Sequence, residues 1–230
     1  MTEQAKESSP AMVLPPGARF YGILDSGYVR PSAWMGKCQA LLEGGADLIQ
    51  LRAKKETARQ REELLKTILP LFVQTGVPLI VNDDIELALK YPRLGLHVGQ
   101  DDLPAEEARR QLGPGRILGL STHSPEQARA ALALPPDTLS YFAVGPVFAT
   151  PTKPDYQPVG LELVRAVSGW KPDLPFFCIG GVNRRTLPDV IEAGGRRAVV
   201  VSDVLRADDT AGAVREMRQA LADARSPDSP

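Results

Sequence analysis

The chain has 230 residues, of which 43% are hydrophobic, 24% charged and 6% aromatic. This composition is typical of a globular chain with a full core and excludes a disordered one. There are 27 Lys and Arg against 28 Asp and Glu, so the chain lacks the basic surplus of a general nucleic-acid binder. No apolar run approaches the ~18 residues of a membrane span. We expect a cytoplasmic protein that binds neither nucleic acids nor membranes.

Both ends of the chain are polar and contain Ser-Pro pairs, which is typical of mobile termini. We expect flexible tails at 1–14 and 225–230 around a single domain at 15–224. The two cysteines, Cys38 and Cys178, are too few for a disulfide framework or a four-thiolate zinc site. Both lie in apolar patterns, so we expect them to be buried.

Eight short apolar runs alternate along the chain with segments of helical periodicity. Several of the runs are continuously apolar, which is typical of parallel strands covered on both faces. In chain order they are Arg19–Leu24, Asp47–Leu51, Pro78–Val81, Leu94–Val98, Ile117–Leu120, Tyr141–Val144, Phe176–Ile179 and Ala198–Val201.

The segments between the runs carry helix signals. An apolar stripe at helical spacing runs from Trp34 to Leu42, where Gly44-Gly45 ends it, and another from Leu64 to Phe72 ends at Gly76. Ser124–Gln127 has the pattern of a capping box with proline at the first helical position.

Eight strand–helix units in one domain of this length predict an α/β fold, a single (β/α)8 TIM barrel. The alternative is an open doubly wound sheet, which usually carries a glycine-rich loop after its first strand. The segment Gly22–Gly27 does not have that pattern.

Polar residues gather where the predicted strands end, which is where barrel enzymes build their sites. Strand alternation places Gln50, Arg52 and Lys54 on one face. Three long polar side chains, two of them cationic, are poor barrel filler and favour an anion site. The alternative is a solvated strand end.

Acidic residues follow the next two strands. Asp83 and Asp102 come after neighbouring strands, so their carboxylates are able to converge on one hard cation such as Mg²⁺. Taken alone, an aspartate at such a place is more often a helix N-cap. We assign that structural role to Asp84 and Asp101 and retain Asp83 and Asp102 as metal ligands.

The last strands are followed by small and hydroxyl-bearing residues. Gly180-Gly181 comes after the seventh strand and Ser202 after the eighth, the usual phosphate cradle of this fold. The only histidines are His97 and His123. We expect His97 to pack or hydrogen-bond inside the barrel, and leave open whether His123 is structural. No motif supports covalent catalysis.

Seven motifs in this order resemble the thiamine-phosphate synthase family over Tyr21 to about Leu205. They are Gln50–Lys54, Asn82-Asp83, Gly95–Asp102, Ser121–His123, Gly145–Lys153, Ile179–Val182 and Val201-Ser202. Each is weak alone, but each falls at a predicted strand end. The departures are Leu139–Tyr141 and Gly195–Ala198, both at the entry ends of strands, where residues serve stability.

The resemblance implies a transferase of thiamine biosynthesis that joins a pyrimidine diphosphate to a thiazole phosphate by a dissociative displacement, releasing diphosphate. It implies that the pyrimidine diphosphate is bound by Gln50, Arg52, Lys54, Asn82, Ser121 and Lys153. It implies that the thiazole phosphate is bound by Thr150, Thr152, Gly181, Val201 and Ser202. Mg²⁺ would be held by Asp83 and Asp102, and the catalytic residues would be Lys153, Arg52 and Ser121.

Two other functions stay open on the same barrel. A thiazole-phosphate tautomerase would keep the phosphate cradle and use His123 for proton transfer, but would not need the diphosphate and Mg²⁺ residues. A non-catalytic regulatory protein would bind the same precursors without turnover. For the assembly we consider a homodimer, and the sequence leaves the oligomeric state open.

Overall fold

The structure is a computed structural model that describes residues 13–150 and 157–224. Its strands form a closed barrel in the order β1 to β8, and every neighbouring pair is parallel. The predicted single (β/α)8 barrel is therefore confirmed, and the open doubly wound sheet is excluded. The strands are β1 Phe20–Asp25, β2 Leu48–Arg52, β3 Leu79–Asn82, β4 Leu94–Val98, β5 Leu118–Thr122, β6 Tyr141–Val144, β7 Phe176–Cys178 and β8 Ala198–Val200.

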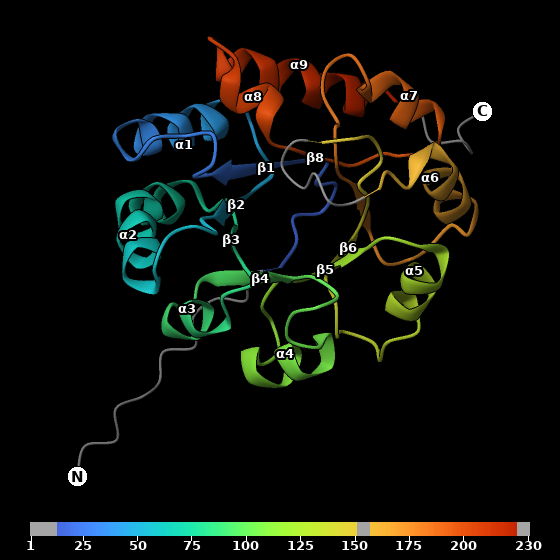
Figure 1. The fold of residues 1–230 in the computed structure, drawn as a ribbon, viewed down its shortest axis with the longest axis horizontal. Coiled ribbons are helices and arrows are strands. Elements are labelled where there is room, and N and C mark those ends of the chain that lie inside the picture. The colour runs from blue at the N-terminus through green and yellow to red at the C-terminus, as the bar shows by residue number, and fades with distance from the viewer. Residues whose placement is uncertain (1–12, 151–156, 225–230) are drawn as a thin grey trace.

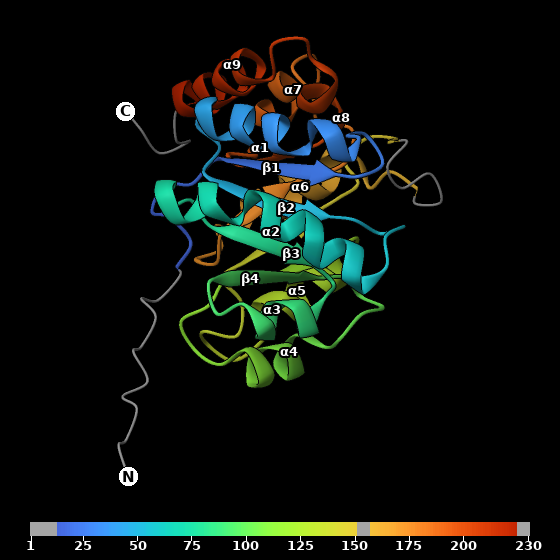
Figure 2. The ribbon, with the colours of Figure 1, turned by 90° about the vertical axis from the view of Figure 1, so that its left-hand side faces the viewer.

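Helices surround the barrel as an outer ring, seen end-on in Figure 1, while Figure 2 shows strands from the side. They are η1 Pro31–Ala33, α1 Trp34–Glu43, α2 Ala58–Thr75, α3 Ile85–Lys90, α4 Ala105–Leu112, α5 Pro125–Leu132, α6 Gly160–Gly169, α7 Leu187–Glu192, α8 Ser202–Arg206 and α9 Thr210–Asp223. The short α8 directly follows β8, and α9 then packs beside α1. None of the helices within the described ranges is both long and apolar enough to cross a membrane.

The predicted helix boundaries are largely confirmed. Helix α2 ends at Gly76, whose φ of 72° is the left-handed conformation that glycine adopts without strain. Ser124 caps α5 by accepting from the backbone N–H of Gln127, but the box is not reciprocal. The Gln127 side chain accepts instead from the backbone of His123. The complete capping box is at Thr57 on α2, which the sequence analysis did not identify.

The apolar residues form two clusters. The larger lies between the strands and the helices and includes Cys38 and Cys178, both buried as expected, and burial raises the pKa of each thiol to about 12. The smaller fills the barrel interior around Tyr21, Tyr141 and Phe177, whose rings meet edge to face. The side chains of this interior cluster fill the barrel below the carboxyl ends of the strands, where barrels of this fold carry their functional sites.

The expected tails mostly lie outside the described residues. Only positions 13 and 14 of the predicted N-terminal tail are described, and Leu14 packs against the interior cluster. The two unusual entry segments have structural contacts. Ser140 accepts from the backbone of Leu118, and Arg196 donates to the carbonyl oxygen of Ile191.

Candidate active site

A cavity of about 220 Å³ is lined by residues from the carboxyl ends of the strands. All predicted site residues within the described ranges line it: Gln50, Arg52, Lys54, Asn82, Asp83, Asp102, Ser121, Thr150, Gly181, Val201 and Ser202. Thr152 and Lys153 lie outside the described residues. Segments far apart in the sequence thus meet because the strands are parallel and end at the same side of the barrel.

The cationic face after β2 is built as the alternation predicts. Arg52 ends β2 and its Nη1 donates to Asp25 Oδ2 at 2.5 Å, with both side chains largely buried. Lys54 is half-exposed and its Nζ lies 2.9 Å from Asp83 Oδ2. Gln50 is buried deeper and its Nε2 donates to the Tyr21 hydroxyl at 2.7 Å. Because the Arg52 guanidinium is buried and held by Asp25, this segment is not a simple solvated strand end, and the geometry favours an anion site.

Asp25 is a site residue that the sequence analysis missed. It ends β1 directly opposite Arg52 in the strand register, and it is 2% exposed. Its second oxygen, Oδ1, accepts from the backbone N–H of Gly27 at 2.7 Å. The available signal was an acid and a base at the ends of two adjacent predicted strands. The carboxylate therefore holds the guanidinium of Arg52 in place at the cavity.

Asp83 and Asp102 are brought together as predicted. Burial is the largest cause that raises the pKa of the Asp102 carboxyl, and the charge of the neighbouring Asp83 raises it further. Asp83 has a φ of 61°, in the left-handed region, and its backbone N–H donates to the His97 carbonyl oxygen. Asp102 Oδ2 accepts from the backbone N–H of Gly99 at 2.8 Å.

Two carboxylates placed side by side are a donor set suited to a hard divalent cation such as Mg²⁺. Within residues 13–150 and 157–224 no cluster of three or more His, Cys, Asp or Glu is arranged for a metal. Asp84 caps α3 as expected, since its side chain accepts from the Leu87 N–H. Asp101 does not cap a helix, because α4 begins after Pro104.

The histidines differ in their surroundings. His97 is buried in the barrel, with Nδ1 2.9 Å from the Tyr141 hydroxyl and Nε2 2.9 Å from Ser121 Oγ, which confirms its expected place. His123 lines the cavity, and its Nδ1 lies 2.5 Å from the carbonyl oxygen of Gly145. The contact with the backbone anchors the His123 ring at the rim.

The loop after β7 contains the predicted glycine pair in left-handed conformations, with φ of 93° for Gly180 and 65° for Gly181. A Cβ on Gly181 would lie 2.6 Å from Phe148 Cβ and 2.9 Å from the Ala149 carbonyl oxygen. Glycine is therefore required at position 181 for the close packing of two loops. Asn183 Nδ2 donates to the Gly181 carbonyl oxygen at 2.9 Å and stiffens the turn.

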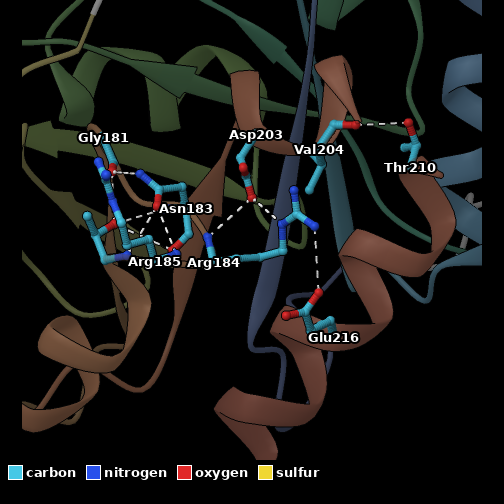
Figure 3. Close-up of polar contacts among 9 residues, drawn as sticks. Gly181, Asn183, Arg184, Arg185, Asp203, Val204, Thr210 and Glu216 are labelled. Atoms are coloured by element: carbon cyan, nitrogen blue, oxygen red, sulfur yellow. Dashed lines mark hydrogen bonds and ion pairs between the residues drawn. The ribbon is translucent and has the colours of Figure 1, made fainter. Parts of the chain in front are cut away.

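An ion pair connects this loop to α8 (Figure 3). Arg184 Nε lies 3.0 Å from Asp203 Oδ2, and the Arg184 backbone N–H donates to the same oxygen at 3.2 Å. Arg184 Nη1 also lies 3.7 Å from a carboxylate oxygen of Glu216 on α9. Asp203 follows Ser202 at the start of α8, so the ion pair joins the β7 loop to the helix that contributes Ser202 to the cavity.

Comparison with known proteins agrees with this geometry. The model of the thiamine monophosphate synthase family matches residues 20–204. The chain is 43% identical over 191 residues to the thiamine-phosphate synthase of Mycobacterium sp. strain KMS, covering 79% of this chain and 83% of that one. It is 40% identical over 201 residues to that of Chloroflexus aurantiacus, covering 87% and 91%.

Solved structures lead to the same family. Thiamine phosphate pyrophosphorylase from Pyrococcus furiosus superposes with a TM-score of 0.78 at 29% identity, covering 90% of this chain and 97% of that one. The 3-hexulose-6-phosphate synthase of Salmonella typhimurium, at 15% identity and a TM-score of 0.65, shares the fold alone. The family match over most of the barrel and the 40% identity to its curated members show that the chain belongs to the thiamine monophosphate synthase family.

Proposed function

We propose that the chain joins 4-amino-2-methyl-5-(diphosphooxymethyl)pyrimidine to 4-methyl-5-(2-phosphooxyethyl)thiazole, giving thiamine phosphate and diphosphate. The observation that carries this proposal is the convergence of two cations and two carboxylates, Arg52, Lys54, Asp83 and Asp102, at the mouth of one cavity. A tautomerase acting on the thiazole alone has no use for that set. The family membership supports the same reaction.

The pyrimidine diphosphate occupies the side of the cavity formed by β2, β3 and β5. Arg52, held by Asp25, presents a guanidinium suited to two phosphate oxygens at once. Lys54 adds a point charge, and Asn82, Gln50 and Ser121 contribute polar groups. Lys153 is included from its place in the sequence motif, since it lies outside the described residues.

Asp83 and Asp102 would hold Mg²⁺ beside the diphosphate. When bound, the ion neutralises the diphosphate oxygens and makes diphosphate a better leaving group. Lys54, which lies 2.9 Å from Asp83, already offsets part of the negative charge of this pair. The two aspartates are thus near enough to the cationic face to share one ligand with it.

The thiazole phosphate occupies the opposite arc, formed by the ends of β6, β7 and β8. Its phosphate rests against Gly181, Val201 and Ser202, where barrels of this fold bind phosphate through loop N–H groups before a short extra helix. Thr150 lines the same side, and Thr152 is included from the sequence motif.

The chemical step needs placement and charge more than proton transfer. The bond from the pyrimidine methylene carbon to the diphosphate oxygen breaks, and its electron pair leaves on that oxygen. The lone pair of the thiazole nitrogen then forms the new C–N bond, so no general base is required. Arg52, Lys153 and Ser121 act by holding the leaving group and the pyrimidine in line with the incoming nitrogen.

An assay with both substrates and Mg²⁺, following diphosphate and thiamine phosphate together, tests the proposal. Equal formation of the two products is the expected result. Proton exchange in the thiazole phosphate without coupling would instead show a tautomerase, with His123 as the candidate proton carrier. Binding of either precursor without turnover would show a regulatory protein.

A further inference from the structure

Five side chains form a continuous hydrogen-bonded chain through the barrel interior. Gln50 Nε2 lies 2.7 Å from the Tyr21 hydroxyl, which lies 3.0 Å from the Tyr141 hydroxyl. The Tyr141 hydroxyl lies 2.9 Å from His97 Nδ1, and His97 Nε2 lies 2.9 Å from Ser121 Oγ. This series of hydrogen bonds begins and ends at two residues proposed to bind the pyrimidine, and two of its three middle members, Tyr21 and His97, line the same cavity.

The direction of these hydrogen bonds follows from counting protons. Gln50 donates through its amide nitrogen, so the Tyr21 hydroxyl accepts there and has one proton to donate. Tyr21 donates this proton to the Tyr141 hydroxyl. The Tyr141 hydroxyl in turn donates its own proton to His97 Nδ1. A neutral His97 then carries its own proton on Nε2 and donates it to Ser121. Every step has one donor and one acceptor.

The reverse direction fits this arrangement less well. Tyr21 would accept from both Gln50 and Tyr141, and its own proton would have no acceptor among the described residues. Tyr21 also lines the cavity but is only 1% exposed, so a donor left without an acceptor there is costly. In the favoured direction the remaining proton is that of the Ser121 hydroxyl, which lines the cavity and is 8% exposed.

We propose that Tyr21, Tyr141 and His97 are positioning residues that fix the Nε2–H tautomer of His97 and thereby make Ser121 a hydrogen-bond donor to the pyrimidine. The same order leaves the Gln50 carbonyl oxygen as an acceptor at the other end. The site is therefore set for a ring with both an acceptor nitrogen and a donor amino group. This rests on the proposed function for the identity of the ligand.

Two further observations agree with the arrangement. Burial raises the pKa of both Tyr21 and Tyr141 above the ordinary tyrosine value, so both hydroxyls keep their protons. The His97 ring stacks on the Tyr141 ring, with centroids 5.6 Å apart and planes 19° apart, which holds the imidazole orientation. Neither group is able to turn away without disrupting the interior packing.

The tautomer is measurable without any substrate, by long-range ¹H–¹⁵N correlation of the whole protein. Only two histidines are present, and a His123→Gln variant assigns their signals. We expect Nε2 of His97 to carry the ring proton and Nδ1 to carry none. A proton on Nδ1 would overturn the proposal whether or not the chain proves to be a synthase.

Tyr141→Phe removes one hydroxyl and keeps the ring packing. We expect the His97 signals to move toward a mixture of tautomers, and the KM for the pyrimidine diphosphate to rise roughly threefold to tenfold, the size of one neutral hydrogen bond. The KM for the thiazole phosphate should stay unchanged. An unaltered His97 tautomer together with an unaltered KM for the pyrimidine diphosphate would contradict the positioning role of Tyr141.

Thr122→Val is the matched control. Thr122 is as buried as Tyr141 and lies on β5 next to Ser121, but its hydroxyl donates to the Ala143 carbonyl oxygen and is not part of the hydrogen-bonded series. It should lower Tm and leave both the tautomer and the two KM values alone. If Thr122→Val reproduced the effects of Tyr141→Phe, general loosening of the barrel would explain them and the proposal would fail. A Tyr141→Phe variant that did not fold would leave the tautomer of the unmodified protein as the deciding measurement.

Discussion

Arg52 shows how a single cation is prepared before any ligand arrives. Its guanidinium is bound to Asp25, and the side chains of the two are only 14% and 3% exposed. The side-chain freedom that ligand binding would otherwise remove is thus already restricted in the free protein. The same burial makes the pair sensitive, because one partner without the other is an uncompensated buried charge.

Arg52→Lys and Asp25→Asn separate the two effects. Arg52→Lys keeps the charge but loses the bidentate geometry, so the KM for the pyrimidine diphosphate should rise at least roughly tenfold, the equivalent of one charge-assisted hydrogen bond. Asp25→Asn should mainly destabilise the fold, by up to about 3 kcal/mol, since Arg52 loses its counterion. Steady-state kinetics and urea unfolding measure the two. Equal kinetic and stability losses in both variants would contradict the separation.

The paired aspartates give a prediction about the metal. Asp83 and Asp102 repel one another, so Asp102→Asn should raise Tm in the absence of metal by removing one charge. The wild type should gain Tm on addition of Mg²⁺, because a ligand that binds only the folded state stabilises it. Asp102→Asn should lose most of that gain and most of the turnover. An equal Mg²⁺-induced shift of Tm in both proteins would remove Asp102 from the metal site.

Between elements, Glu62 on α2 links that helix to its neighbour α3. Its carboxylate accepts from Lys90 Nζ at 2.7 Å and from the Tyr91 hydroxyl at 2.8 Å, and pairs with Lys66 on its own helix. The hydrogen bond from Lys90 is the largest of the causes that lower the pKa of Glu62 to about 2, from an ordinary value of 4.5. The unfolded chain therefore binds a proton at this group at higher pH than the folded chain.

This difference sets the direction of a pH effect. The contribution of Glu62 to stability is complete above pH 4.5 and is lost as pH falls toward about 2. Glu62→Gln should be less stable than the wild type at neutral pH. Between pH 4.5 and about 2 its stability should fall less than that of the wild type. Unfolding measured by circular dichroism at several pH values checks this, with Glu162→Gln as the control, since Glu162 is exposed and pairs with Arg165 on its own helix α6. Parallel acid profiles for wild type and Glu62→Gln would contradict it.

The ion pair between the β7 loop and α8 also links two elements of the barrel. Arg184→Met frees the loop from Asp203, so the KM for the thiazole phosphate should rise by up to roughly fivefold, in keeping with the ~1 kcal/mol of a partly exposed pair. The pyrimidine KM should not change. Arg165→Met removes a comparable ion pair on α6, away from the cavity, and serves as the control. Recovery in a double variant with the two charges exchanged would assign the effect to the pair itself.

At the scale of the whole barrel, the strands were predictable because parallel strands covered on both faces are apolar throughout. The predicted runs at Leu94–Val98 and Tyr141–Val144 match β4 and β6 residue for residue. The convergence of the predicted site residues on one cavity was predictable for a related reason, since parallel strands bring their carboxyl ends to one side. The separate helix α8 was not predicted, because its five residues are too few to show a helical period.

Contacts between side chains of different strands were not predictable from the sequence. The pairing of Asp25 with Arg52 depends on the register of β1 and β2, and the chain of hydrogen bonds through Tyr21 and Tyr141 on the distance across the interior. Nor did the sequence show that Gly181 packs against Phe148. Because a Cβ there would disturb the fold, Gly181→Val does not separate ligand binding from folding, and other variants are needed to test the two subsites.

The order of strands around the barrel gives that test, because the pyrimidine residues lie on β2, β3 and β5 and the phosphate loops follow β7 and β8. Ser202→Ala removes one hydroxyl and should raise the KM for the thiazole phosphate roughly threefold to tenfold, leaving the pyrimidine KM unchanged. Lys54→Met, at a half-exposed position, should do the reverse. In the double variant both KM values should rise by the single-variant factors, since independent sites add in free energy. Saturation curves for each substrate measure all four proteins. A rise in the pyrimidine KM from Ser202→Ala alone would mean that the two subsites are exchanged.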